Sequence, residues 1–234
     1  MVFRMKIIDI LEEIVKEIDK NNPYDLVLKG GTALALFYLN KHRESEDLDF
    51  DCSKTNLKDY KEIEMYFVTI LERLEKKGMI KDFKISKSGF ALTNRYHIKL
   101  VLETYKKIYT KIDIDFVELT NVRKRKELGL YSVERLFVGK MLSFVDRNEF
   151  KDLYDIYYLL DKVDINLFRK NENVVELIEK VLNVIEKENI LDLYKKAFRN
   201  VDLRFKDLKQ TGLESFILKL VRKLRVLENK ICWY

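Results

Sequence analysis

The sequence contains few of the residues on which zinc and disulfide sites depend. Among its 234 residues are two cysteines, Cys52 and Cys232, which lie far apart without CxxC spacing, and two histidines. We therefore expect neither a zinc site nor a disulfide framework. The chemistry of this chain must rest on carboxylates and lysines, and Cys52 and His42 are predicted to be bystanders.

Long apolar runs are absent as well. Charged residues interrupt the N-terminal stretch MVFRMKIIDILEEIVKEI, and no apolar run approaches the ~18 residues that a membrane span needs. A composition of 47% hydrophobic and 36% charged residues is typical of a globular protein rather than a disordered one. The sequence thus predicts a cytoplasmic protein with no membrane segment, long enough for one large domain or two small ones.

Charges of both signs are abundant, with an excess of positive charge. The formal net charge of +6 and the pI near 9.0 favour a polyanionic partner such as nucleic acid, but a basic enzyme without such a partner has the same balance. The basic run Arg123 to Lys126 fits either a solvated loop or a contact with RNA. Charge alone therefore does not decide the partner.

Glycine is scarce, yet two of the seven glycines are adjacent in the stretch around which the chain is organised. Gly30 and Gly31 follow a short apolar run, Leu26 to Leu28, and precede Thr32 and a run of helical character that ends at Leu39. This order predicts a strand, a tight turn and a helix start. Free N–H groups at such a start can bind phosphate, although an ordinary strand-to-helix turn would use the same glycines.

Acidic residues begin 15 positions after Thr32. Asp47, Asp49 and Asp51 alternate along a predicted strand, so the side chains of Asp47 and Asp49 project from one face and can hold the same divalent ion or pair of ions. A solvated strand face is the alternative interpretation. Three like charges on one face repel one another without a counter-ion, and this repulsion favours a metal site.

These residues resemble those of a known family. The string GGTALALFYL, followed by R-x-S-x-D-L-D-F with Arg43 and Ser45 before the two aspartates, is similar to the AbiEii/AbiGii toxin family of nucleotidyltransferases, a branch of the DNA polymerase β-like superfamily. A second block resembles the family's K…R…RDLYDL segment: Glu134-Arg135-Leu136, Lys140, Arg147 and Lys151-Asp152-Leu153-Tyr154-Asp155. Lys151 stands where arginine is more usual.

The resemblance implies an α+β fold, with a polymerase β-like nucleotidyltransferase mixed sheet flanked by helices and followed by an α-helical C-terminal bundle. It implies nucleotide-binding residues at these positions: Gly30, Gly31, Thr32, Arg43, Ser45, Lys140, Asp152 and Asp155. The implied catalytic residues are Asp47, Asp49, Asp113 and Lys140. The three aspartates among them would bind two Mg²⁺ ions.

The third metal carboxylate has two candidates on one predicted strand. From Tyr109 to Val117 the residues alternate, so that Asp113 and Asp115 share one face with Lys111 while apolar residues share the other. The superfamily takes this carboxylate from a strand next to the first two. The family's K-I-D strand resembles the sequence that ends at Asp113, which makes Asp113 the first choice and Asp115 the second.

The same resemblance implies transfer of a nucleotidyl group from an NTP by the toxin of a toxin–antitoxin or phage abortive-infection system, encoded with a separate antitoxin protein. The positive charge favours RNA, and tRNA in particular, as the acceptor. Three alternatives remain open: a nucleotide-binding regulator, a nucleotidyltransferase that modifies protein instead of RNA, and a nucleic-acid-binding module whose acids are incidental.

Periodicity places secondary structure around these motifs. Apolar residues recur at helical spacing from Phe3 to Ile18 and from Leu57 to Leu74. Strand-like runs follow: Met79–Ile85, Phe90–Thr93 continuing into Tyr96–Tyr105, and Tyr109–Leu119. From Ser132 onward the patterns are helical, the last two covering Leu167–Phe198 and Phe205–Glu228. A basic connector, Asn121–Leu130, separates a nucleotidyltransferase domain over residues 1–125 from an α-helical domain over 126–234 that carries the second motif block.

Overall fold

A computed structural model of the chain describes residues 6–192, 195, 208 and 212–232. The chain divides into two units. Unit 1 comprises residues 1–37 and 45–132, and unit 2 comprises residues 38–44 and 133–234. Unit 2 therefore includes a short segment that lies, in the sequence, between the glycine pair and the acidic strand.

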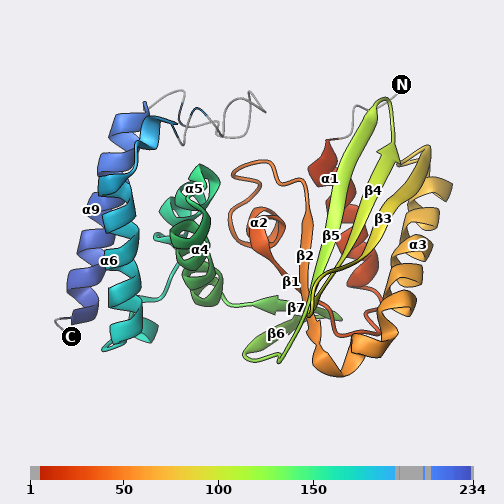
Figure 1. Cartoon of the computed structure of the whole chain (residues 1–234), viewed down its shortest axis with the longest axis horizontal. Helices are drawn as coiled ribbons and strands as arrows, with labels where there is room; N and C mark the ends of the chain where they lie inside the picture. Colours follow the sequence, from red (N-terminus) through yellow and green to blue (C-terminus); the bar gives the residue numbers. More distant parts are fainter. Residues whose placement is uncertain (1–5, 193–194, 196–207, 209–211, 233–234) are drawn as a thin grey trace. The chain divides into compact units, whose positions relative to one another are not determined.

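Unit 1 is organised around a mixed sheet (Figure 1). Within the described residues the sheet has seven strands, in the order β3-β4-β5-β2-β1-β7-β6. Their bounds are β1 Val27–Lys29, β2 Leu48–Ser53, β3 Asp82–Leu92, β4 Arg95–Glu103, β5 Lys107–Val117, β6 Val122–Arg125 and β7 Leu128–Tyr131. Strand β2 runs parallel to β5, and β1 runs parallel to β7, while the other neighbours are antiparallel.

Helices cover the apolar face of this sheet. Phe67 of α3 (Tyr60–Lys76) packs against Phe50 of β2 with ring centroids 5.9 Å apart, and α1 (Ile7–Ile18) packs against α3. The apolar residues of the alternating strand β5, such as Ile114, are buried. The acids of β2 and β5 therefore occupy the opposite face, as the alternation predicts. Three short helical turns follow the central strands: α2 Gly30–Ala33, the π-turn η1 Leu34–Tyr38, whose last residue belongs to unit 2, and the 3-10 turn η2 Lys54–Asp59.

From Val133 onward, the described part of unit 2 consists of helices and the turns that join them, which confirms the predicted C-terminal helices. Its elements are α4 Val133–Arg147, α5 Phe150–Leu159, the 3-10 turn η3 Ile165–Phe168, α6 Glu172–Lys187 and α9 Leu213–Cys232. Figure 1 shows α6 and α9 side by side. Aromatic rings of α5 pack around Phe216 of α9, with the Tyr157 ring 4.7 Å away. Residues 196–207, at the end of one predicted helical pattern and the start of the next, lie outside the described residues. None of the helices in the described ranges has both the length and the apolar character that a membrane crossing requires.

The basic connector expected over Asn121–Leu130 is a β-hairpin, contrary to the sequence prediction. Strands β6 and β7 pair antiparallel, and β7 continues the sheet by pairing with β1. Strand β6 lies at the edge of the sheet, where Arg123 and Lys124 are both exposed, so no apolar alternation marks it as a strand. The boundary predicted at residue 125 falls inside this hairpin, whereas the two units divide after Ser132.

Two strand limits also differ from those read in the sequence. Strand β3 continues to Leu92, and a turn at Thr93–Asn94 leads into β4, so Phe90 belongs to the earlier strand. Strand β2 begins at Leu48, so Asp47 lies one residue before the strand instead of within it. The Asp47 side chain consequently reaches the acidic face of the sheet from the segment that precedes β2.

Candidate functional site

The glycine turn brings the chain from β1 into α2 directly beside an acidic side chain. Gly30 has a positive φ of +72°, which side-chain-bearing residues adopt at a cost. A Cβ atom at this position would overlap the carboxylate of Asp49. The strand register explains this closeness, because Lys29 pairs with Asp49. Glycine is therefore required at position 30 both by the backbone and by the neighbouring acid.

Two residues of unit 1 that are predicted to bind the nucleotide contact each other. Thr32 and Ser45 are both buried, and their hydroxyl oxygens lie 2.8 Å apart. The Thr32 hydroxyl also donates a hydrogen bond to the backbone carbonyl of Asp47, at 2.5 Å. These contacts fix the segment that enters β2 and so place Asp47. The nucleotide-binding role of Thr32 and Ser45 stays a prediction.

Two of the three predicted metal carboxylates lie on adjacent strands, and Asp47 directly precedes one of them. Asp49 of β2 pairs in register with Asp113 of β5. The ammonium of Lys111 lies 2.7 Å from Asp113 Oδ2 and 3.9 Å from Asp47 Oδ2. Burial, together with the charges of Asp49 and Asp113, raises the pKa of Asp47 although Lys111 opposes the shift. The carboxylates thus repel one another, and a cation between them would be stabilised.

The donor atoms are suited to Mg²⁺, although they do not form a closed cage. Within the described residues, no three or more histidine, cysteine, aspartate or glutamate side chains converge closely enough to hold a metal ion. Mg²⁺ typically takes one or two carboxylates from the protein and completes its shell with water and substrate phosphates. The in-register pair Asp49 and Asp113 can supply that number.

A second in-register pair, Asp51 and Asp115, is already engaged by cations. Lys29 forms ion pairs with both carboxylates, at 2.6 Å from Asp115 Oδ2. Arg95 donates two hydrogen bonds to Asp115, at 2.5 and 2.8 Å, and the Tyr131 hydroxyl donates one to Asp51 at 2.6 Å. Burial alone would raise the pKa of Asp115, but Arg95 and Lys29 outweigh it and lower the pKa. The geometry therefore favours Asp113 over Asp115 as the third metal ligand.

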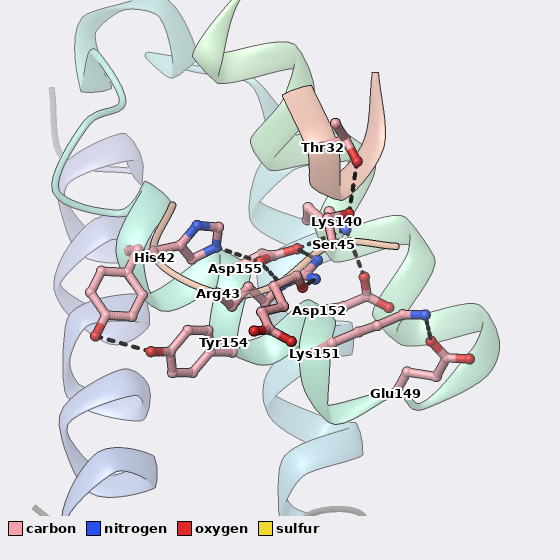
Figure 2. A network of polar contacts seen from close by, with 12 residues as sticks. Thr32, His42, Arg43, Ser45, Lys140, Glu149, Lys151, Asp152, Tyr154 and Asp155 are labelled. Atoms are coloured by element: carbon pink, nitrogen blue, oxygen red, sulfur yellow. Dashed lines mark hydrogen bonds and ion pairs between the residues drawn. The ribbon is translucent and has the colours of Figure 1, made fainter. Parts of the chain in front are cut away.

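In unit 2, three side chains converge on Asp155 (Figure 2). Arg43 binds it in bidentate fashion, with Nε 2.6 Å from Oδ1 and Nη2 2.7 Å from Oδ2. His42 Nε2 lies 2.7 Å from Oδ1, and Lys140 Nζ lies 2.8 Å from Oδ2. Asp155 is completely buried. Burial alone would raise its pKa, but the charges of Arg43 and Lys140 hold the pKa well below its usual range.

Asp152 holds the other side of Lys140. Its Oδ1 accepts from Lys140 Nζ at 3.0 Å, and Arg147 donates two hydrogen bonds to its carboxylate, each at 2.8 Å. Lys140 is buried between the two aspartates. Lys151, at the position where the family usually has arginine, pairs instead with Glu149 at 2.6 Å. The network fixes the position of the Lys140 ammonium.

The structure thus places the predicted residues in two groups. The group in unit 1 consists of Gly30, Gly31, Thr32, Ser45, Asp47, Asp49 and Asp113. The group in unit 2 consists of Arg43, Lys140, Asp152 and Asp155, which contact one another. Sequence reasoning did not assign Lys29, Arg95 or Tyr131, and it treated His42 as a bystander although His42 contacts Asp155. No local pattern marks these residues, because their partners are set by strand register or lie far along the chain.

Known proteins resemble this chain in sequence pattern and in fold. A family model described as "Nucleotidyl transferase AbiEii toxin, Type IV TA system" matches residues 13–223. JHP933 from Helicobacter pylori is similar in structure, with a TM-score of 0.66 and 21% sequence identity over 95% of this chain and 90% of JHP933. MenT4, a nucleotidyltransferase toxin from Mycobacterium tuberculosis H37Rv, has a TM-score of 0.50 and 13% identity over 94% of this chain and 82% of its own. At these identities the two structures show a shared fold. No curated protein sequence matches.

Proposed function

Because this chain belongs to the AbiEii family of nucleotidyltransferase toxins of type IV toxin–antitoxin systems, we propose that it transfers a nucleotidyl group from an NTP to tRNA in the cytoplasm and that a cognate antitoxin opposes it. The observation that carries the proposal is the in-register pair Asp49 and Asp113 beside the turn at Gly30. This arrangement offers carboxylates for a metal and a glycine turn for phosphate on the same part of the sheet.

Asp47, Asp49 and Asp113 would hold two Mg²⁺ ions. When bound, these ions supply positive charge to the phosphates and lower the pKa of the attacking hydroxyl. The backbone N–H groups of Gly31 and Thr32 would donate hydrogen bonds to phosphate oxygens. In unit 2, the Lys140 ammonium, held by Asp152 and Asp155, would offer a fixed positive charge of the kind that stabilises phosphate.

The reaction follows from these roles. A hydroxyl oxygen of the acceptor attacks the α-phosphorus of the NTP and forms a new P–O bond. The bond between the α-phosphorus and the bridging oxygen breaks, and pyrophosphate leaves with the electron pair. The hydroxyl proton passes to solvent or to a nearby carboxylate. Arg43 is buried against Asp155, which also pairs with Lys140, and this supports a role for Arg43 in positioning Lys140.

The test is to incubate the purified protein with each labelled NTP, Mg²⁺ and total RNA, and to separate labelled RNA from labelled protein. We expect label in the tRNA fraction. Asp47→Asn and Asp49→Asn should each abolish labelling while leaving the fold intact, because each removes one ligand charge. Asp82→Asn is a matched control, since Asp82 is an exposed acid at the start of β3 in the same sheet. Near-wild-type labelling by both Asp47→Asn and Asp49→Asn would show that these residues do not hold the metal. Labelling of protein alone would exclude tRNA as the acceptor.

A further inference from the structure

The acidic face of the sheet in unit 1 presents two similar carboxylate pairs. Asp49 pairs with Asp113, and two residues further along the same two strands Asp51 pairs with Asp115. The pairs are about 7 Å apart along the strands. By composition alone, either pair could bind a divalent ion. The two pairs differ in the lysine that accompanies each of them.

Lys29 is enclosed between Asp51 and Asp115. It extends from β1, the neighbour of β2 on the side opposite β5, and forms ion pairs with both carboxylates. Its side chain is 26% exposed, and those of its partners are 7% and 12% exposed. Arg95 and Tyr131 occupy further oxygens of the same pair. Lys29 thus stands where a metal ion would stand between two carboxylates.

Lys111 accompanies the other pair in a more exposed position. It lies 2.7 Å from Asp113 Oδ2, but its side chain is 40% exposed and its second carboxylate contact, to the 41% exposed Asp47, is 3.9 Å long, whereas Lys29 pairs closely with both of its carboxylates. An ammonium that is more exposed to water is held less strongly, so an incoming cation displaces Lys111 more readily than Lys29. Removing Lys29 would leave the carboxylates of Asp51 and Asp115, 7% and 12% exposed, with an uncompensated charge. A divalent ion would therefore replace Lys111 but not Lys29.

We propose that Lys29 is a built-in counter-cation that excludes divalent ions from Asp51 and Asp115, and thereby confines them to the pair Asp49 and Asp113. The proposal rests on the metal site of the proposed function and adds the residue that selects its position. Lys29 acts through the carboxylates it neutralises, so it is a positioning residue.

The experiment measures Mn²⁺ binding by calorimetry and electron paramagnetic resonance, together with melting temperature, in the full chain. Lys29→Met removes the charge at similar volume, and Lys29→Arg keeps it. We expect Lys29→Met to melt at a lower temperature in EDTA, to bind an additional Mn²⁺ ion, and to regain its melting temperature when Mn²⁺ is present. Lys29→Arg should bind the same number of ions as the wild type.

Further variants assign the new ion to its pair. The single variant Asp49→Asn should lose the Mn²⁺ binding of the wild type. The double variant Asp49→Asn with Lys29→Met should bind Mn²⁺ again. Adding Asp51→Asn to this double variant should abolish binding. The proposal is wrong if the Lys29→Met variant neither binds an additional Mn²⁺ ion nor changes its melting temperature when Mn²⁺ is added.

A second measurement does not require the Lys29→Met variant to fold. With Lys29 intact, Asp51→Asn should leave Mn²⁺ affinity unchanged, whereas Asp49→Asn should lower it about tenfold or more. Equal losses in the two variants would contradict the role of Lys29. If the wild type binds no Mn²⁺ but the Lys29→Met variant does, the metal site of the proposed function is wrong, while the role of Lys29 is still supported.

Discussion

At the scale of single residues, the charge balance in the interior of unit 2 depends on Asp155. Asp155→Asn keeps the shape of the side chain but removes the negative charge that faces Arg43 and Lys140. We expect the free energy of unfolding to fall by about 3–5 kcal/mol, because the buried Arg43 loses its carboxylate partner and Lys140 loses one of its two. Urea unfolding of the purified variant measures this change.

A matched aspartate serves as the control for this prediction. Asp161 also pairs with a lysine, Lys223 at 2.6 Å, but its side chain is 62% exposed. Asp161→Asn should therefore cost less than about 1 kcal/mol. Equal losses in the two variants would mean that burial does not amplify the Asp155 interactions.

A second prediction at this scale concerns Gly30. Gly30→Ala would place a methyl group against the Asp49 carboxylate at a positive φ, so we expect a loss of about 1–3 kcal/mol in the free energy of unfolding. Gly139 lies within α4, and a Cβ atom there would meet nothing within 4 Å. Gly139→Ala should be neutral or stabilising by up to about 1 kcal/mol. Thermal unfolding of both variants tests the contrast, and a harmless Gly30→Ala would contradict the close approach of Asp49.

At the scale of secondary-structure elements, one glutamate joins α1 to the end of α3. Glu17 accepts hydrogen bonds from Lys20, three residues further along the chain, and from Lys77, each at 2.6 Å. These bonds lower the pKa of Glu17 to about 2. Since the folded-state pKa lies below the ordinary value of 4.5, the stabilisation is complete above about pH 4.5 and is lost as the pH falls towards 2.

Glu17→Gln should therefore lower the free energy of unfolding by about 1–2 kcal/mol at pH 7, a value reduced for the solvent exposure of the two lysines. The difference from the wild type should shrink towards zero as the pH approaches 2. Denaturant unfolding across this range measures it. Glu13→Gln, which breaks a pair with Lys16 inside the same helix, should have a smaller effect. A difference that does not depend on pH would exclude the ion pairs as its cause.

At the scale of the whole molecule, the net charge of +6 governs association with a polyanion. If the acceptor is tRNA, labelling at limiting RNA should fall about tenfold or more between roughly 50 and 200 mM salt, because bound counterions are released on association. Initial rates of label transfer at each salt concentration test this. Transfer that does not respond to salt would argue against an RNA acceptor.

The exposed basic residues of β6 allow a sharper form of the same test. Arg123→Gln with Lys124→Gln lowers the net charge by two at the edge of the sheet. Lys219→Gln with Arg222→Gln makes the same change of charge on α9. If β6 contacts RNA, the first double variant should weaken binding more than the second. Equal effects would indicate that only the total charge matters.

The sequence by itself determined the features that depend on neighbouring residues. Alternation along residues 109–117 predicted the buried and acidic faces of β5, because successive side chains of a strand point to opposite sides. Helical periodicity predicted the C-terminal helices, and the order of two motif blocks identified the family. The hairpin over β6 and β7 escaped detection because an edge strand exposed to solvent carries no apolar alternation.

Only the tertiary structure decided which charges meet. Lys29 and Asp115 are 86 residues apart in the sequence, and Arg43 and Asp155 are 112 apart. The first contact depends on the register of three strands, and the second on a segment of seven residues, 38–44, that belongs to unit 2. Neither is set by local propensity, because a lysine or arginine is equally compatible with its own strand or loop whichever acid lies opposite. The sequence therefore identified the acidic residues, and the tertiary structure determined which cation each of them pairs with.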